Sequence, residues 1–283
     1  MLPKADLHIH TNCSDGRLTP VEAVELASEK KLAALSITDH DTFDGYFKGL
    51  KRAKELEIEL IPGVEITSSY KNRESHILAY YFDVDTSYFA DFLLSQRIAR
   101  RDRIKGIIKK VNDVGVDINY DEVRAEANGA NIGRPHLAKI LIQKGYVSSI
   151  ADAFKRYLST EKLGEIDNNY PDFEEVIQII KNVGGASILA HPSRFYSKSE
   201  IEEFVEAGID GIECIHPSHN WKMQKEYTEF VERNSLLLTG GSDYHGGKDL
   251  AYTHLGVVCV ASKHCAKMKR MTDQRKQLVE IKK

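Results

Sequence analysis

Two short motifs at opposite ends of the chain carry the residue types of a metal site. His8 and His10 stand two residues apart near the amino terminus, and Asp243 and His245 have the same spacing near the carboxyl terminus. Alternate side chains of an extended chain point to one face, so each pair aims both side chains at one point. Imidazole nitrogens and carboxylate oxygens without a cysteine cluster suit catalytic Zn, Mn or Fe(II) better than a structural thiolate zinc site. The motifs therefore predict hydrolysis with several bound metal ions.

Four more candidate ligands lie beside short apolar runs between these motifs. They are His40, Glu65, His76 and His191. Three of them close their run, whereas His76 opens the run 75–82, where a surface imidazole is the alternative interpretation. The active site of a (β/α) barrel lies at the carboxyl-terminal edge of its strands, so one shared rim explains these positions.

The elements expected around these residues alternate strand with helix, which is typical of a parallel sheet or barrel. Apolar runs predict strands at residues 5–9, 32–37, 60–64, 75–82, 186–190, 211–215 and 236–239. Amphipathic stretches predict helices at residues 20–31, 47–56, 173–182, 199–207 and 222–233. The predicted fold class is α/β.

The alternation stops over residues 95–160, where a continuous helical pattern is interrupted only by glycines. We interpret this stretch as a helical insertion over the barrel mouth, between barrel segments 1–94 and 161–262. Its first helix is rich in Arg and Lys. A solvated face explains most of these cations, and one or two could steer phosphate. The basic residues 263–283 are expected to form a terminal helix or a frayed tail.

Composition describes a compact globular chain. Its 283 residues are 42% hydrophobic and 29% charged, which is ordinary for a folded protein, and the length suffices for one α/β domain with an insertion. The first predicted strand begins almost at Met1, with no basic leader and no apolar stretch that could cross a bilayer, which favours the cytoplasm. The four cysteines lack CxxC spacing and fit a reducing compartment.

Five motifs together resemble the polymerase and histidinol phosphatase (PHP) superfamily of metal-dependent phosphoesterases. They are HIHTNCSDG, ITDHDT, PGVEI, AHPSR and GGSDYHG, and the match runs from Leu2 to about Val260. The resemblance implies a distorted (β/α)7 barrel. It is closest to the branch that removes the 3′-phosphate from nucleoside 3′,5′-bisphosphates or trims short 5′-monophosphorylated RNA. That branch also has a helical insertion between its GVE and AHP motifs.

The resemblance also implies a site for two to three divalent ions of Mn, Fe or Zn, with three positions. The implied ligands are His8, His10, Glu65 and Asp243 for one ion, Glu65, His76 and His191 for a second, and Asp15, His40 and His245 for the third. A water between such ions loses a proton near neutral pH and becomes the nucleophile, which makes His191 and Asp243 catalytic candidates. Without the family resemblance, a simple turn cap is the alternative interpretation of Asp15. Asp39 and Asp41 are expected to support the site rather than to bind metal.

Candidate substrate contacts lie in three further places. Arg134 and His136 belong to a GRPH stretch in which proline marks a helix start, so free N–H groups and the guanidinium could clamp a phosphate. An exposed arginine at a plain helix start is the alternative. Arg194 in AHPSR is a second cation on the predicted rim. His216 and His219 in HPSH could touch phosphate or protonate the leaving oxygen. Core or surface packing is the alternative interpretation of His216, and we favour His219.

One departure concerns residues 164–170, which are acidic and rich in amides where relatives usually show a small aromatic segment. The resemblance therefore supports the metal chemistry more strongly than a contact from this loop to the base or the sugar.

These features predict a metal-dependent phosphoric monoester hydrolase that releases the 3′-phosphate of nucleoside 3′,5′-bisphosphates, with trimming of short 5′-phosphorylated RNA as a second activity. A net charge of −3 gives no general attraction to membranes or long duplexes, so a small nucleotide or short oligonucleotide is the expected partner. Histidinol phosphate or another small phosphomonoester is the alternative substrate, although histidinol phosphatases tend to carry histidine at the position of Asp15. An inactive, metal-stabilised binding module is the alternative from another class. The filled ligand positions argue against it.

Overall fold

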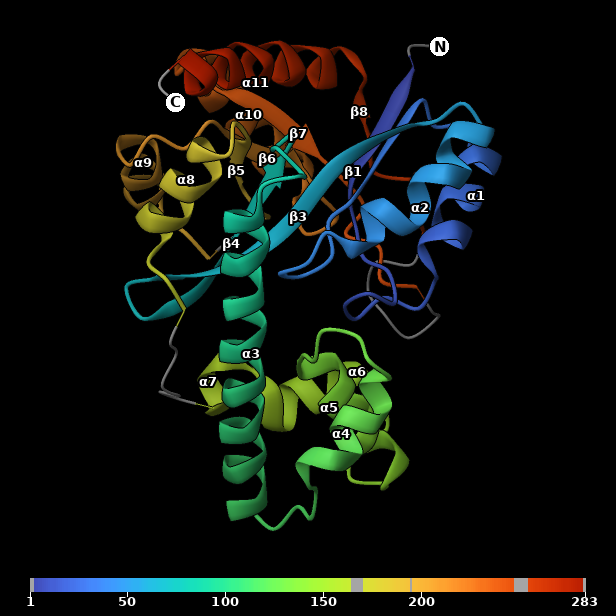
Figure 1. Cartoon of the computed structure of the whole chain (residues 1–283). Helices are drawn as coiled ribbons and strands as arrows, with labels where there is room; N and C mark the ends of the chain where they lie inside the picture. The colour runs from blue at the N-terminus through green and yellow to red at the C-terminus, as the bar shows by residue number, and fades with distance from the viewer. Residues whose placement is uncertain (1–2, 164–169, 194, 247–253, 282–283) are drawn as a thin grey trace.

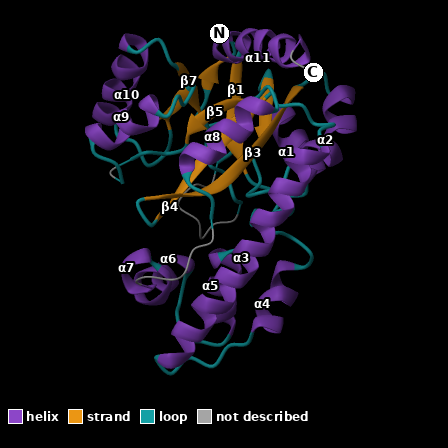
Figure 2. Ribbon diagram, turned by 60° about the vertical axis from the view of Figure 1, so that its left-hand side comes forward, coloured by secondary structure: helices purple, strands orange, loops and turns teal. Residues whose placement is uncertain are grey.

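A single sheet of eight strands curls into a distorted, nearly closed barrel (Figures 1 and 2). The computed structural model describes residues 3–163, 170–193, 195–246 and 254–281. The strands are β1 (Lys4–Ile9), β2 (Ala34–Ile37), β3 (Glu59–Tyr70), β4 (Arg73–Tyr80), β5 (Ala186–Leu189), β6 (Gly211–Ile215), β7 (Leu237–Gly240) and β8 (Val260–Ala261), and their spatial order is β7-β6-β5-β4-β3-β2-β1-β8. The predicted distorted barrel with a helical insertion is confirmed.

Two hydrogen bonds join the segment after β7 to the end of β1. The His10 N–H donates to the Tyr244 carbonyl at 2.8 Å, and the Asp243 N–H donates to the His8 carbonyl at 2.8 Å. This contact brings the HxH and DxH motifs, more than 200 residues apart in the sequence, to the same edge of the barrel.

The distortion comes from β4, which pairs antiparallel with both of its neighbours, while β1 to β3 and β5 to β7 form parallel pairs. A two-residue turn at Lys71 and Asn72 joins β3 to β4, and both residues have positive φ, as hairpin turns of this length favour. The hairpin extends β3 well past the predicted end at residue 64. Glu65 therefore lies inside a strand, and not after one.

Among the described residues, six helices flank the barrel: α1 (Pro20–Glu29), α2 (Asp44–Glu55), α8 (Phe173–Asn182), α9 (Lys198–Glu206), α10 (Trp221–Arg233) and α11 (Lys263–Ile281). The basic carboxyl-terminal stretch is thus a helix through Ile281, with Cys265 and Met268 buried against the barrel core. Arg275 of α11 binds both carboxylate oxygens of Asp210 at 2.7 and 2.8 Å. In Figure 1, α11 crosses the end of the barrel opposite the insertion.

One long helix links the barrel to the insertion. Helix α3 (Ser87–Asp113) begins before residue 95, and its first turns place Phe89 and Leu93 in the barrel core. Its later turns place Ile107 and Val111 in a separate core shared with the short helices beside it (Figure 1). These are α4 (Tyr120–Ala127), α5 (Arg134–Gln143), α6 (Ile150–Ala153), a π-helical turn (Phe154–Leu158) and α7 (Thr160–Leu163). The division of the chain at residues 94, 160 and 262 stays a prediction, and α3 crosses the first of these boundaries.

The described part of the chain contains no helix that is both long enough and apolar enough to span a membrane.

Candidate metal centre

All nine predicted ligands meet at one end of the barrel. Each comes from a strand, from the end of a strand or from the loop just after one, and together they draw on β1, β2, β3, β4, β5 and β7. The residues are His8, His10, Asp15, His40, Glu65, His76, His191, Asp243 and His245. The barrel edge predicted from strand ends is therefore the place where these side chains gather.

Glu65 lies at the middle of the cluster and is only 1% exposed. Five imidazole nitrogens lie 2.9–3.4 Å from its two carboxylate oxygens, and they belong to His8, His10, His40, His76 and His191. A carboxylate in this position can bridge two cations, because its oxygens face different sets of imidazoles. Oε2 faces the imidazoles of β1 and β2, and Oε1 faces those of β4 and β5.

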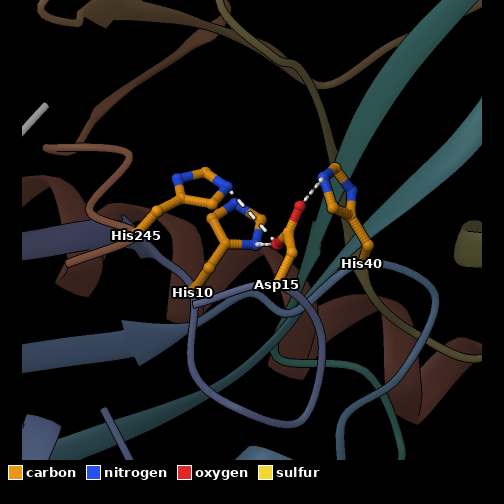
Figure 3. A group of neighbouring side chains, drawn as sticks. All are labelled: His10, Asp15, His40 and His245. Atoms are coloured by element: carbon orange, nitrogen blue, oxygen red, sulfur yellow. Dashed lines mark ion pairs between the residues drawn. The ribbon is translucent and has the colours of Figure 1, made fainter. Parts of the chain in front are cut away.

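Asp15 holds the second focus of the cluster (Figure 3). Its Oδ1 lies 3.4 Å from His245 Nε2 and 3.6 Å from His10 Nδ1, and its Oδ2 lies 3.8 Å from His40 Nε2. In Figure 3 the carboxylate lies between the ring of His40 on one side and the rings of His10 and His245 on the other. The Asp15 carboxylate therefore points into the ligand cluster, so its role is not limited to capping a turn.

The electrostatics keep the carboxylates ionised. Burial raises the pKa values of Asp15, Glu65 and Asp243, but the neighbouring histidines outweigh burial and hold all three well below their ordinary values. Burial lowers the pKa of His10, yet its carboxylate partners raise it to about 10, and the same balance raises the pKa of His76 to about 9. The carboxylates thus attract cations, either protons on the imidazoles or metal ions between imidazole and carboxylate.

The donor set fits divalent metal. The Nε2 atoms of His8 and His10 lie only 3.2 Å apart, and both face the carboxylates of Glu65 and Asp243. The buried Nδ1 atoms of His40 and His76 lack a hydrogen bond of good geometry within the described residues. Several groups of three or four such donors lie within 4.8 Å of one another. Mixed nitrogen and oxygen donors without thiolate suit Mn, Fe(II) or Zn.

The supporting acids Asp39 and Asp41 are buried and are bonded to neighbouring strand ends. Asp39 accepts hydrogen bonds from the N–H and Oγ1 of Thr11 at 2.7 and 2.6 Å. Asp41 accepts from the N–H and Oγ1 of Thr67 at 2.8 and 3.0 Å, and from Arg100 Nε at 2.9 Å. Their hydrogen bonds are those of supporting residues, as the sequence predicted.

Two further acids that the motifs do not predict support the ligands. Glu74 accepts from His76 Nε2 at 3.1 Å, and Glu213 accepts from His8 Nδ1 at 3.0 Å. Glu213 stands in the run GIECI, where an acid inside a buried strand is a signal that could have found it. Glu74 is the second residue of β4, two residues before His76, and its sequence context carries no comparable signal.

The structure places Arg134 and His136 at the contact between the insertion and the barrel. Arg134 Nη2 donates to Glu74 Oε1 at 3.2 Å, and Arg103 Nη1 lies 2.7 Å from the other oxygen of the same carboxylate. His136 Nδ1 accepts the N–H of Gly133 at 3.0 Å. The predicted phosphate clamp is therefore engaged with protein groups.

His219 lies beside the loop that carries His191. Its Nδ1 donates to the Cys214 carbonyl at 3.0 Å, and its Nε2 accepts the N–H of Ser193 at 3.0 Å. Burial lowers the pKa of His219 to about 4. This imidazole is neutral at pH 7 with both nitrogens bonded. Arg194 and residues 164–169 lie outside the described residues.

A cavity of about 520 Å³ lies between the loop after β1 and the insertion. Its lining includes Ser14, next to Asp15, and the basic side chains of Arg17, His136 and Lys139. The connection before α5 also touches the rim, because Asn131 Nδ2 donates to the His40 carbonyl at 2.7 Å. The cavity therefore adjoins the Asp15 end of the ligand cluster.

Comparisons with known proteins agree with this geometry. A family model described as PHP domain matches residues 6–220. The chain is 34% identical over 250 residues to a 5′-3′ exoribonuclease of Haemophilus influenzae, and the aligned region covers 87% of this chain and 91% of that protein. It is 30% identical over 258 residues to a 3′,5′-nucleoside bisphosphate phosphatase of Chromobacterium violaceum, covering 88% and 90%. A solved structure of a candidate metal-dependent phosphoesterase from Bifidobacterium adolescentis matches with a TM-score of 0.85 at 30% identity, covering 94% of this chain and 96% of that one.

Proposed function

Because the chain belongs to the PHP domain family, we propose that it releases the 3′-phosphate from nucleoside 3′,5′-bisphosphates and also trims short 5′-phosphorylated RNA. The resemblance predicted from the motifs is confirmed, and the chain is a metal-dependent phosphoesterase. The substrate is the proposed part. It is supported by relatives at 34% and 30% identity that carry these two activities in their names.

The observation that carries the proposal is the arrangement of ionised carboxylates and imidazoles around Glu65 and Asp15. We propose that it holds three divalent ions in the three ligand groups that the family resemblance implies, with Glu65 shared by two of them. When bound, the ions supply Lewis acidity toward the phosphoryl group and lower the pKa of water. His191 and Asp243, the catalytic candidates, would be among the ligands that hold these ions.

The chain's own basic groups are suited to the second phosphate of a bisphosphate. Arg134 is 21% exposed and shares Glu74 with Arg103, so Arg134 can turn to a phosphate while Glu74 keeps a cation. His136, Arg17 and Lys139 line the cavity at the Asp15 end of the site. A nucleotide with its 3′-phosphate at the ligand cluster would have room there for its remaining part. Arg194 stays a further candidate contact.

His219 is proposed as a substrate contact and proton donor, on conditions that the geometry sets. Its Nε2 must exchange the Ser193 N–H for the leaving oxygen or for a phosphate oxygen. Because its pKa of about 4 leaves His219 neutral at pH 7, Nε2 must also gain a proton before it can donate one.

The test is phosphate release from adenosine 3′,5′-bisphosphate by Mn(II)-loaded protein. Adenosine 5′-monophosphate, histidinol phosphate and a short 5′-phosphorylated RNA serve as comparison substrates, and Asp243→Asn as a control of matched shape. We expect release from the bisphosphate and slow trimming of the RNA, both lost in Asp243→Asn. Preferential turnover of histidinol phosphate would refute the substrate assignment. Bound metal with no turnover of any substrate would support a binding module instead.

A further inference from the structure

Glu213 is a completely buried carboxylate just outside the ligand cluster. It lies in β6, between Ile212 and Cys214, and its side chain is 0% exposed. Both of its oxygens accept hydrogen bonds from residues of the cluster. Oε1 accepts from His8 Nδ1 at 3.0 Å, and Oε2 accepts from the backbone N–H of His191 at 2.8 Å.

The first of these bonds fixes the tautomer of His8. A neutral imidazole has one N–H and one lone pair, and an acceptor at Nδ1 keeps the proton there. The lone pair of Nε2 then points toward the cluster, where this atom lies 3.4 Å from Glu65 Oε2 and 3.4 Å from Asp243 Oδ1. Without Glu213, the proton on His8 could move to the nitrogen that faces the cluster.

The second bond holds a strained backbone. His191 has φ of +27°, a conformation that residues other than glycine rarely adopt and that surrounding contacts must maintain. In this conformation the imidazole reaches Glu65, with Nε2 2.9 Å from Oε1. Loss of the Glu213 acceptor would let the loop after β5 relax and withdraw the ring.

We propose that Glu213 is a positioning residue that sets the orientation of His8 and His191 for two different metal ions. The proposal rests on the metal ligands of the proposed function. A direct metal–Glu213 bond is the competing reading, because Glu213, His8 and His216 form a group of possible donors. It would require His8 to bind metal through Nδ1, away from the nitrogen that faces Glu65 and Asp243.

Glu213→Gln changes the hydrogen-bonding capacity of this side chain while keeping its shape. Two N–H donors face this side chain, and a carboxylate offers an acceptor oxygen to each. A glutamine of the same shape offers one acceptor oxygen and one NH2 group, so it can satisfy only one donor and places a donor against the other. The variant should therefore keep its fold and bind metal more weakly.

The experiment measures Mn(II) binding to metal-stripped protein by equilibrium dialysis, with total metal determined by mass spectrometry. Wild type is compared with Glu213→Gln, and with Glu229→Gln as an exposed control on α10. We expect Glu213→Gln to bind Mn(II) 10- to 100-fold more weakly, to reach the same number of ions at saturation, and to regain most activity in excess Mn(II). Circular dichroism reports whether each variant is folded, and Glu213→Asp serves as a second variant because it cannot reach both donors.

Each outcome separates the two hypotheses. Unchanged affinity in a folded Glu213→Gln that still turns over the bisphosphate overturns the positioning role and leaves the proposed function standing. Loss of one ion at saturation, with the others bound as before, overturns it in favour of direct ligation. Absence of Mn(II) binding and activity in wild type itself refutes the proposed metal site on which the inference rests.

Discussion

Replacing Arg100 with methionine should weaken the attachment of the insertion to the barrel. Arg100 lies on α3 and is 7% exposed, and its Nε donates to Asp41 Oδ2 at 2.9 Å. Its other end donates to Thr67 Oγ1 on β3. Asp41 itself is 0% exposed and directly follows His40. The pair thus joins the first helix of the insertion to the part of the rim that carries a candidate ligand.

The expected loss follows from what Asp41 keeps. Removing one partner of a buried ion pair costs about 3–5 kcal/mol, because the remaining charge stays buried without compensation. Asp41 retains the N–H and Oγ1 hydrogen bonds of Thr67, which offset part of this cost. We therefore expect Arg100→Met to lower the free energy of unfolding by about 3 kcal/mol, at the low end of that range.

The assay is urea unfolding of metal-stripped protein at pH 7, followed by circular dichroism, in a double-mutant cycle with Asp41→Asn. The double variant should be little less stable than either single variant, which gives a coupling energy of about 2 kcal/mol or more. Arg101→Met, at the exposed next position of α3, is the matched control and should change stability by no more than about 0.5 kcal/mol. A loss below about 1 kcal/mol, or additive single effects within about 0.5 kcal/mol, would refute the reasoning.

Three further predictions concern the site and its surroundings. The folded pKa of His219, about 4, lies below the ordinary 6.5, so the unfolded chain binds more protons between these values and stability rises with pH across this window by up to about 3 kcal/mol. In His219→Phe the urea midpoint should therefore change less with pH between pH 4.5 and 7 than in wild type. An unchanged pH dependence of the midpoint would contradict this. Because His10 and His76 have pKa values of about 10 and 9, metal must displace protons, and Mn(II) affinity should rise from pH 6.5 to pH 8.5; calorimetric titrations that give equal affinities would count against it. Gly241→Ala should abolish Mn(II) binding, since an added Cβ would lie 2.4 Å from the backbone nitrogen of His8, and a variant with normal binding and melting temperature would show the argument to be wrong.

The sequence predicted most of the residues that gather in the candidate site, because strand ends have a recognisable pattern. Apolar runs that end in HxH or DxH predict both the strand and the direction of its polar side chains, and β6 and α8 have the predicted bounds. Glu65 differed for a physical reason. It was placed after a strand at residues 60–64, but pairing with β4 carries β3 on to Tyr70. The hairpin turn at Lys71 and Asn72 lacks the glycine that usually marks such turns.

The supporting residues were harder to predict because their roles depend on distant partners. The Glu213 carboxylate meets His8 from 205 positions away, and no local spacing encodes that contact. The sequence predicts Arg134 as a phosphate clamp. Its contact with Glu74 depends on how the insertion packs against β4. Tertiary packing decides both contacts.

Buried acids beside the cluster explain how short strands and loops can hold nine side chains in register. Each of four such acids accepts at least two hydrogen bonds and links its strand, or the loop just after its strand, to neighbouring segments. Asp6 on β1 accepts from the N–H groups of Ser242 after β7 and of Gly256. Asp39 after β2 accepts from Thr11 after β1, and Asp41 accepts from Thr67 on β3. Glu213 on β6 joins β1 to the loop after β5.

Hydrogen bonds to these acids also offset the free-energy cost of burying their carboxylates. A buried carboxylate is tolerated only when hydrogen bonds replace its lost hydration, and backbone N–H groups at strand ends are donors that would otherwise lack partners. One hydrogen-bonded carboxylate thus satisfies the loose backbone of two adjacent segments and fixes their relative position. The ligand cluster therefore takes its rigidity from side-chain bridges between strand ends. Loss of any one of these hydrogen-bonded carboxylates should therefore displace ligands on two strands at once.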